Sequence, residues 1–272
     1  MSRRARVDVE LVRRGLARSR QQAAELIGAG RVTIDGIPAV KPATAVAVTA
    51  DLAVATDGER SWVSRGAHKL MGALDAFEIT VEGRRCLDAG ASTGGFTEVL
   101  LGRGAVRVIA ADVGYGQLAW SLRTDPRVSV VERTNARDLS PDVIGGPVEV
   151  IVADLSFISL ASVLPALTAC ALPDADIVPM VKPQFEVGRG QVGTGGVVRD
   201  SKLRTAAVLA VAHRAEQLAW RTVGVTASPL PGPSGNVEYF LHLRTVPSRP
   251  GHLLTGDALR HAVEDAVAKG PQ

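Results

Sequence analysis

Four charged side chains, two lysines and two carboxylates, stand where they could share one cleft. Asp154 ends a predicted strand in Val-Ala-Asp-Leu-Ser, and Lys182 ends the following one in Val-Lys-Pro-Gln-Phe. Glu238 starts the last predicted strand in Gly-Asn-Val-Glu-Tyr-Phe, and Lys69 lies on a predicted helix. A lysine held among carboxylates can move a proton. A structural ion pair is the alternative for any single residue, but four such groups at one cleft favour catalysis.

A glycine-containing loop after an earlier predicted strand has the composition of a ligand-binding turn. It runs Asp88-Ala-Gly-Ala-Ser-Thr-Gly-Gly-Phe96, and Asp112 ends the next strand. A carboxylate at that position can accept both hydroxyls of a ribose. A nicotinamide dinucleotide also suits these features, but Ser92 replaces its second glycine and Asp88 would repel a pyrophosphate. We therefore predict S-adenosylmethionine, a cationic sulfonium, as the cofactor.

The predicted cofactor site extends beyond this loop. The segment Thr134-Asn-Ala-Arg137 follows the third strand, where an adenine pocket is expected, and turn 229–236 is expected to line the cleft. Histidine and cysteine show no paired spacing, so no metal site is predicted. The predicted cofactor-binding residues are Asp88, Gly90, Ser92, Thr93, Gly94, Gly95, Phe96, Asp112, Asn135, Ala136, Asp154 and Phe157.

Strands that alternate with helices must position these groups. The pattern predicts strands near 84–89, 107–112, 128–133, 149–154, 176–182, 222–228 and 238–244. Helices are predicted near 66–77, 94–103, 116–123, 158–171 and 201–219. Such alternation indicates an α/β, Rossmann-like fold with a mostly parallel seven-stranded sheet covered on both faces. Ligands bind at the carboxyl ends of strands in such sheets.

A small α+β module precedes this domain. Two helices are predicted, one over 7–15 and one that starts after the N-cap Ser19, followed by a strand at 31–34, a turn at Asp35-Gly36 and strands at 46–48 and 52–55. Residues 1–31 carry eight arginines and a balance of +5, against +3 for the whole chain. The charge indicates a polyanion-binding surface, with a merely solvated basic face as the alternative.

The order of residues in this module resembles a known RNA-binding family. The run Arg6-Val-Asp-x-x-Leu-Val-x-x-Gly-Leu-x-x-Ser-Arg-x-x-Ala-x-x-Leu-Ile-x-x-Gly-x-Val-x-Ile-Asp-Gly is similar to the alpha-L module of the ribosomal-protein S-four type. The resemblance implies RNA contacts at the start of the second helix, where backbone N–H groups also favour phosphate. The predicted RNA-binding residues are Arg4, Arg6, Arg18, Arg20 and Arg65. We predict an RNA-binding domain over 1–59, a linker over 60–63 and a second domain over 64–272.

The second domain resembles the FtsJ-like ribose 2′-O-methyltransferases, which use a Lys-Asp-Lys-Glu tetrad. The tetrad corresponds here to Lys69, Asp154, Lys182 and Glu238. Together with the N-terminal module, the chain to about residue 245 is similar to the TlyA family. That resemblance implies methyl transfer to the ribose 2′-hydroxyl of cytidine in ribosomal RNA of both subunits, in the cytoplasm, with ribosomal RNA or a subunit as partner. Lys182 would act as the base or as an electrostatic group.

Two other functions are considered. Members of this family are also called haemolysins, so a membrane-active protein is one alternative. Leu155–Pro173 has no charged residue, but serines, Pro165 and the flanking Asp154 and Asp174 favour a strand end and a buried helix. A non-catalytic ribosome-binding factor is the other alternative, and the intact tetrad argues against it. No signal peptide is expected, and the two cysteines suggest buried thiols in a reducing compartment. The target nucleotide and the oligomeric state stay open.

Overall fold

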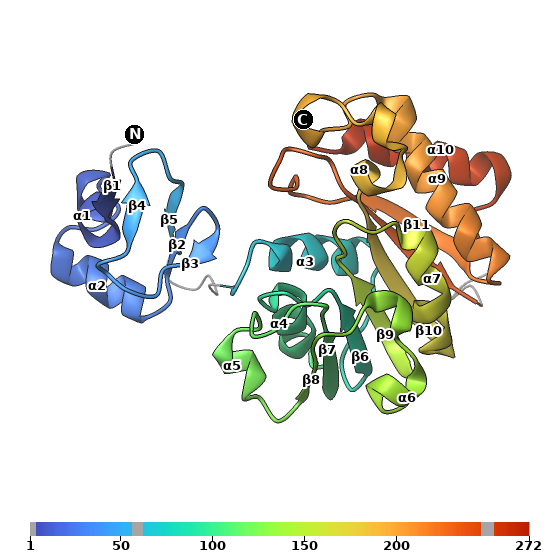
Figure 1. Cartoon of the computed structure of the whole chain (residues 1–272), viewed down its shortest axis with the longest axis horizontal. Helices are drawn as coiled ribbons and strands as arrows, with labels where there is room; N and C mark the ends of the chain where they lie inside the picture. The colour runs from blue at the N-terminus through green and yellow to red at the C-terminus, as the bar shows by residue number, and fades with distance from the viewer. Residues whose placement is uncertain (1–3, 56–61, 246–252, 272) are drawn as a thin grey trace. The chain divides into compact units, whose positions relative to one another are not determined.

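The protein divides into two compact units, residues 1–67 and 68–272, each considered separately here. A computed structural model describes residues 4–55, 62–245 and 253–271 (Figure 1). Residues 60 and 61 of the predicted linker therefore lie outside the described residues.

The N-terminal unit is a pair of short helices packed on small sheets. Its elements are β1 (Arg4–Arg6), α1 (Val7–Arg13), α2 (Arg20–Gly28), β2 (Val32–Ile34), β3 (Ile37–Pro38), β4 (Ala45–Ala47) and β5 (Leu52–Val54). The N-cap prediction is confirmed, since Ser19 Oγ accepts a hydrogen bond from the N–H of Gln22. The β2–β3 hairpin turns at Asp35 and Gly36, both with positive φ. Strand β1, which pairs with β4, was not predicted.

The second unit is built on one seven-stranded sheet in the order β11-β12-β10-β9-β6-β7-β8. Its strands are β6 (Arg85–Ala89), β7 (Arg107–Ala111), β8 (Val128–Val131), β9 (Val148–Ala153), β10 (Ala171–Val181), β11 (Arg221–Ala227) and β12 (Tyr239–Arg244). Strand β12 is the reversed strand of this sheet and runs antiparallel to both β10 and β11. The predicted fold class is confirmed. Because β12 is reversed, its first residues lie at the edge where the parallel strands end.

Helices cover both faces of this sheet. They are α3 (Gly66–Ala76), α4 (Gly95–Gly102), α5 (Trp120–Arg123), α6 (Pro141–Ile144), α7 (Leu160–Ala169), α8 (Pro183–Glu186), α9 (Ser201–Gln217) and α10 (Gly256–Lys269). Helices α7, α9 and α10 share one core with Leu241, whereas Phe96 of α4 packs on Phe240. Successive strand residues face opposite sides, so these contacts define the two faces. Figure 1 shows α9 and α10 lying together on one face.

The buried helix expected within the stretch 155–173 is present as α7. Two features differ from the sequence-based expectation. The predicted helix 116–123 is reduced to the four residues of α5. Helix α10 lies in the C-terminal tail, where no element was predicted, although Leu259, Val263 and Ala266 show helical spacing and are buried. In the described part of the chain, no helix combines the length and apolar character needed to cross a membrane.

A buried ion cluster holds the edge of the sheet opposite the strands' carboxyl ends. Asp176 on β10 is 3% exposed and accepts hydrogen bonds from Arg84 (2.7 Å) and Arg244 (2.6 Å). His242 Nε2 lies 2.7 Å from the same carboxylate. Burial alone would raise the pKa of Asp176, but the hydrogen bonds from His242 and Arg84 lower it to about 2.

Replacing Asp176 by asparagine should destabilise the protein near neutral pH. The change leaves two arginines near a neutral amide, and breaking a buried ion pair costs about 3 kcal/mol or more. The stabilisation by the Asp176 carboxylate is complete above its unfolded-state pKa of about 3.9 and is lost as pH falls toward 2. Urea unfolding at pH about 7 and about 2.5 measures this. The gap between wild type and Asp176→Asn should shrink at the lower pH, whereas the exposed Asp265→Asn should match wild type at both.

Candidate active site

A cavity of about 560 Å³ opens at the carboxyl ends of β6, β7 and β9. The lining includes seven of the predicted cofactor-binding residues, namely Gly90, Ser92, Asp112, Asn135, Ala136, Asp154 and Phe157. Gln117, Arg137 and Leu155 also line it and were not predicted as cofactor-binding. The other five predicted residues, Asp88, Thr93, Gly94, Gly95 and Phe96, do not line it. The structure therefore brings together the strand-end residues but not the far half of the glycine loop.

Asp112 is the acidic side chain that joins the glycine loop to β7. Its Oδ2 accepts a hydrogen bond from the N–H of Ser92 (2.8 Å), and its Oδ1 accepts one from the N–H of Gly114 (2.6 Å). Each carboxylate oxygen can accept a further hydrogen bond. Asp112 is therefore fixed in place and still able to accept two ribose hydroxyls.

Asp88 differs from the expectation of a charge presented to the ligand. Its side chain is fully buried, and its Oδ2 accepts a hydrogen bond from Thr97 Oγ1 at 2.7 Å. Its Oδ1 is buried and has no hydrogen-bond partner among the described residues. Burial raises the pKa of Asp88 to about 7. The carboxyl is thus a buried acceptor beneath the loop, and its charge is lost close to neutral pH.

Glycine is required at position 90 by a close approach of backbone. Gly90 has a φ of +88°, and a Cβ there would lie 2.4 Å from the carbonyl oxygen of Asp154. Farther along, Gly94 packs against Leu122, and the ring of Phe96 lies 6.2 Å from that of Phe240. The second half of the loop therefore seats α4 on the sheet.

Two lysine–carboxylate pairs lie beside the cavity. Lys69 Nζ is 2.5 Å from Glu238 Oε2, and Lys182 Nζ is 2.6 Å from Asp154 Oδ1. Lys182 also donates a hydrogen bond to Ser156 Oγ at 2.9 Å. Both lysines are buried, and Glu238 is 1% exposed. Burial raises the pKa of Glu238, opposed by Lys69 and Lys182, so the two pairs act on one another.

An exposed aromatic side chain stands at the mouth of the cavity. Phe157 is 91% exposed, has a φ of +63°, and its ring lies 5.1 Å from that of Phe185 on α8. The short helix α8 is held by Glu186, which accepts hydrogen bonds from Ser159 Oγ (2.6 Å) and from the N–H of Leu160 (2.8 Å). The two phenylalanines thus form a fixed apolar rim.

The turn before β12 holds Glu238 in position, a role that sequence reasoning missed. A Cβ on Gly232 would lie 2.6 Å from Glu238 Oε1. Asn236 is 2% exposed; it accepts a hydrogen bond from the N–H of Val198 (2.9 Å) and donates one to Gly196 O (2.8 Å). The end of segment 188–196 is therefore tied to this turn through Gly196. The small-residue run Gly-Pro-Ser-Gly-Asn was the available signal.

The predicted RNA-binding arginines all lie in the N-terminal unit. Arg6 and Arg20 both form ion pairs with the buried Asp8, at 2.9 and 3.0 Å, and keep exposed guanidinium groups. Arg4, Arg18 and Arg65 are exposed. Across the residues that the structure describes, no group of three or more His, Cys, Asp or Glu side chains is placed to hold a metal ion.

The second unit has the fold of a class I methyltransferase: the order of its sheet reverses between β6 and β9, and the cavity opens at that point beside the two buried pairs. A small module of an RNA-binding type precedes it in the chain. A family model for FtsJ-like methyltransferases matches residues 62–245, and one for the S4 domain matches residues 5–52. The chain belongs to the TlyA family of FtsJ-like methyltransferases.

Relatives of known name match over most of the chain. The 16S/23S rRNA (cytidine-2′-O)-methyltransferase TlyA of Mycobacterium tuberculosis H37Rv is 73% identical over 100% of both chains. Hemolysin A of Brachyspira hyodysenteriae is 38% identical and covers 87% of this chain and 98% of its own. A solved structure from Streptococcus thermophilus, described as a hemolysin, is 36% identical, covers 99% of this chain and 96% of its own, and has a TM-score of 0.73.

Enlarging Gly232 should impair the site without unfolding the protein. In Gly232→Ala the new methyl group meets Glu238 Oε1, so the carboxylate must move away from Lys69. Methyl transfer should fall by about ten-fold or more, because a displacement of about 1 Å can cost about 100-fold. Turnover and melting temperature should be measured beside Gly28→Ala, where a Cβ meets nothing within 4 Å. Equal turnover in the two variants would contradict the assigned role.

Proposed function

We propose that the protein transfers a methyl group from S-adenosylmethionine to the ribose 2′-hydroxyl of cytidine in ribosomal RNA of both subunits. The observation that carries this proposal is the pair of buried lysine–carboxylate contacts, Lys69–Glu238 and Lys182–Asp154, beside a cofactor-sized cavity. The substrate named for the Mycobacterium tuberculosis relative supports the choice of RNA and of nucleotide.

The residues of the cavity fit S-adenosylmethionine. Its volume of about 560 Å³ lies within the usual range for small-molecule sites. Asp112 would accept the ribose hydroxyls, and Asn135 and Ala136 would border the adenine. Asp88, buried beneath the loop and outside the cavity lining, would support the loop through Thr97 and would not contact the cofactor. When bound, the cofactor supplies an electrophilic methyl group.

The chain's own residues orient the hydroxyl and remove its proton. In the proposed step, the neutral amine form of Lys182 receives the proton from the 2′-hydroxyl, and Asp154, 2.6 Å away, stabilises the ammonium that results. The hydrogen bond from Lys182 Nζ to Ser156 Oγ also fixes the orientation of the lysine amine. Lys69, fixed by Glu238, supplies positive charge where the oxygen loses its proton. Phe157, in contact with Phe185, presents an exposed apolar ring at the border of the site.

The two units divide the work. We propose that residues 1–59 bind the RNA, that residues 60–63 connect the domains, and that residues 64–272 perform methyl transfer. The match of residues 5–52 to the S4 domain supports RNA binding by the first unit. The partner is ribosomal RNA or a ribosomal subunit, and the reaction takes place in the cytoplasm. No metal enters the proposed reaction.

Removing either lysine of the pairs should abolish most turnover while sparing cofactor binding. Lys182→Ala and Lys69→Ala should each reduce methyl transfer to ribosomal RNA by about 10²–10⁴-fold, the usual cost of a lost proton-transfer group. Calorimetry should show nearly unchanged affinity for S-adenosylmethionine. Asp112→Ala should behave differently from the lysine variants, because it should strongly lower the affinity for S-adenosylmethionine.

The exposed Lys269→Ala is the matched control and should behave as wild type. Near-wild-type turnover in Lys182→Ala would overturn the proposed roles of the two pairs. Unchanged cofactor affinity in Asp112→Ala would instead move the cofactor to another site.

Removing basic side chains from the N-terminal unit should weaken RNA binding in a salt-dependent way. The triple variant Arg4→Ala, Arg18→Ala and Arg20→Ala loses up to three phosphate contacts. The slope of log affinity against log salt should become shallower by about 2 to 3 units, at roughly 0.7–0.9 per phosphate. Asp8 keeps its ion pair with Arg6, so the fold should persist. If the triple variant keeps both the RNA affinity and the salt slope of wild type, these arginines do not contact the RNA and the proposed role of this unit is wrong.

A further inference from the structure

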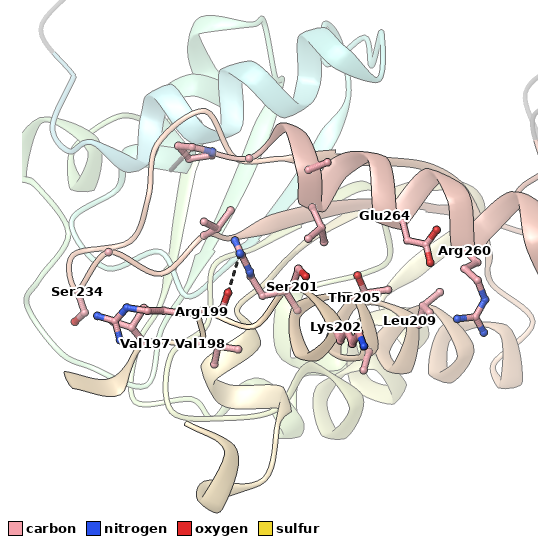
Figure 2. A pocket seen from close by; sticks show the side chains of 18 residues that line it. Val197, Val198, Arg199, Ser201, Lys202, Thr205, Leu209, Ser234, Arg260 and Glu264 are labelled. Atoms are coloured by element: carbon pink, nitrogen blue, oxygen red, sulfur yellow. Dashed lines mark hydrogen bonds between the residues drawn. The ribbon is translucent and has the colours of Figure 1, made fainter. Parts of the chain in front are cut away.

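A second cavity, of about 1120 Å³, lies in the methyltransferase unit between α9, α10 and segment 234–237. Four basic side chains line it against one acidic side chain, Glu264: these are Arg199, Lys202, Arg204 and Arg260. Figure 2 shows Arg199 beside Ser234 at one end of the cavity and Arg260 at the other. The cavity is therefore elongated, with positive charge at both ends. Nothing in the proposed reaction uses it.

This cavity and the catalytic pairs share one segment of chain. Val237 lines the cavity, whereas the next residue, Glu238, pairs with Lys69. Neighbouring side chains in an extended segment point to opposite sides. Asn236, which precedes both, is fixed by its hydrogen bonds to Gly196 and Val198. A ligand in the cavity would thus lie directly behind the segment that carries Glu238.

Arg204 is held in place in the lining of the cavity. Its Nη2 donates a hydrogen bond to Arg199 O at 3.0 Å, drawn as the dashed line in Figure 2. Burial raises the pKa of Tyr239, and the charge of Arg204 and a hydrogen bond from Arg204 oppose that rise. Arg204 therefore contacts both Arg199 and Tyr239, which fixes one cationic side chain before a ligand enters the cavity.

We infer that this cavity holds a backbone phosphate of the RNA substrate, from a nucleotide that flanks the methylated one. A phosphodiester offers the anionic oxygens that arginine and lysine bind, and the hydroxyls of Ser201 and Thr205 can donate to it as well. Val197 and Leu209 provide an apolar wall for the adjoining sugar. This assignment rests on the proposed function, because it takes the substrate to be RNA.

The test compares two triple variants of equal charge. The cavity variant, Arg199→Gln, Lys202→Gln and Arg260→Gln, removes three of the four basic side chains and leaves Arg204 in place. Arg107→Gln, Arg127→Gln and Arg221→Gln removes the same charge at the opposite edge of the sheet, where β7, β8 and β11 begin. With ribosomal RNA, the cavity variant should raise KM by about ten-fold or more, and the slope of log KM against log salt should become shallower by about 1 unit, the contribution of one phosphate. Its turnover at saturating RNA and its affinity for S-adenosylmethionine should equal those of the control variant.

A second variant distinguishes RNA binding inside the cavity from a general effect of positive charge on the protein surface. Thr205→Trp keeps every charge but places a large ring in the cavity beside the proposed phosphate, so it should raise KM as the charge variant does. Unchanged KM in Thr205→Trp, or equal KM and salt slope in the two triple variants, would overturn the inference while wild type still methylates RNA. A wild-type protein that methylates no RNA would instead refute the proposed function. Retained cofactor affinity in each variant shows that the fold is intact, and a KM effect on cofactor alone would assign the cavity to another ligand and overturn the inference.

Discussion

The structure depends on keeping two buried lysines paired. An unpaired charge in this position would cost several kcal/mol, so Lys69 and Lys182 require Glu238 and Asp154 within contact distance. The topology meets that requirement because β12 runs antiparallel to β10 and begins where the parallel strands end. The order of the sheet therefore decides which carboxylates can meet which lysines.

Much of this could be predicted from the sequence, since apolar runs bounded by Asp or Lys place strand ends within a few residues. Lys69, Asp154, Lys182 and Glu238 were identified as candidates. The alternation of strands and helices explains why Asp154 and Lys182 meet, whereas the position of Glu238 depends on the reversed strand β12. Tertiary contacts could not be predicted. From its place at the start of the glycine loop, Asp88 was expected to face the ligand. In the structure its side chain is buried and accepts a hydrogen bond from Thr97. Helix α10 was not predicted, although Leu259, Val263 and Ala266 recur at helical spacing and provided the signal.

The N-terminal unit shows how a small domain keeps basic side chains available. Asp8 is buried, yet it holds Arg6 and Arg20 from two different elements with their guanidinium groups still exposed. Both side chains are thereby restrained before any anion arrives, which lowers the entropy lost on binding. A single internal acid thus organises a basic surface without neutralising it.

The contact between Gly90 and the carbonyl of Asp154 limits how this enzyme can change over evolution. No side chain can be introduced at Gly90 without moving the backbone that carries Asp154. A lineage that introduced a side chain in the loop there would displace the carboxylate that pairs with Lys182 in the same step. Only coordinated substitutions on both strands could escape, so grafting a foreign loop between β6 and α4 should succeed only when the end of β9 is exchanged with it.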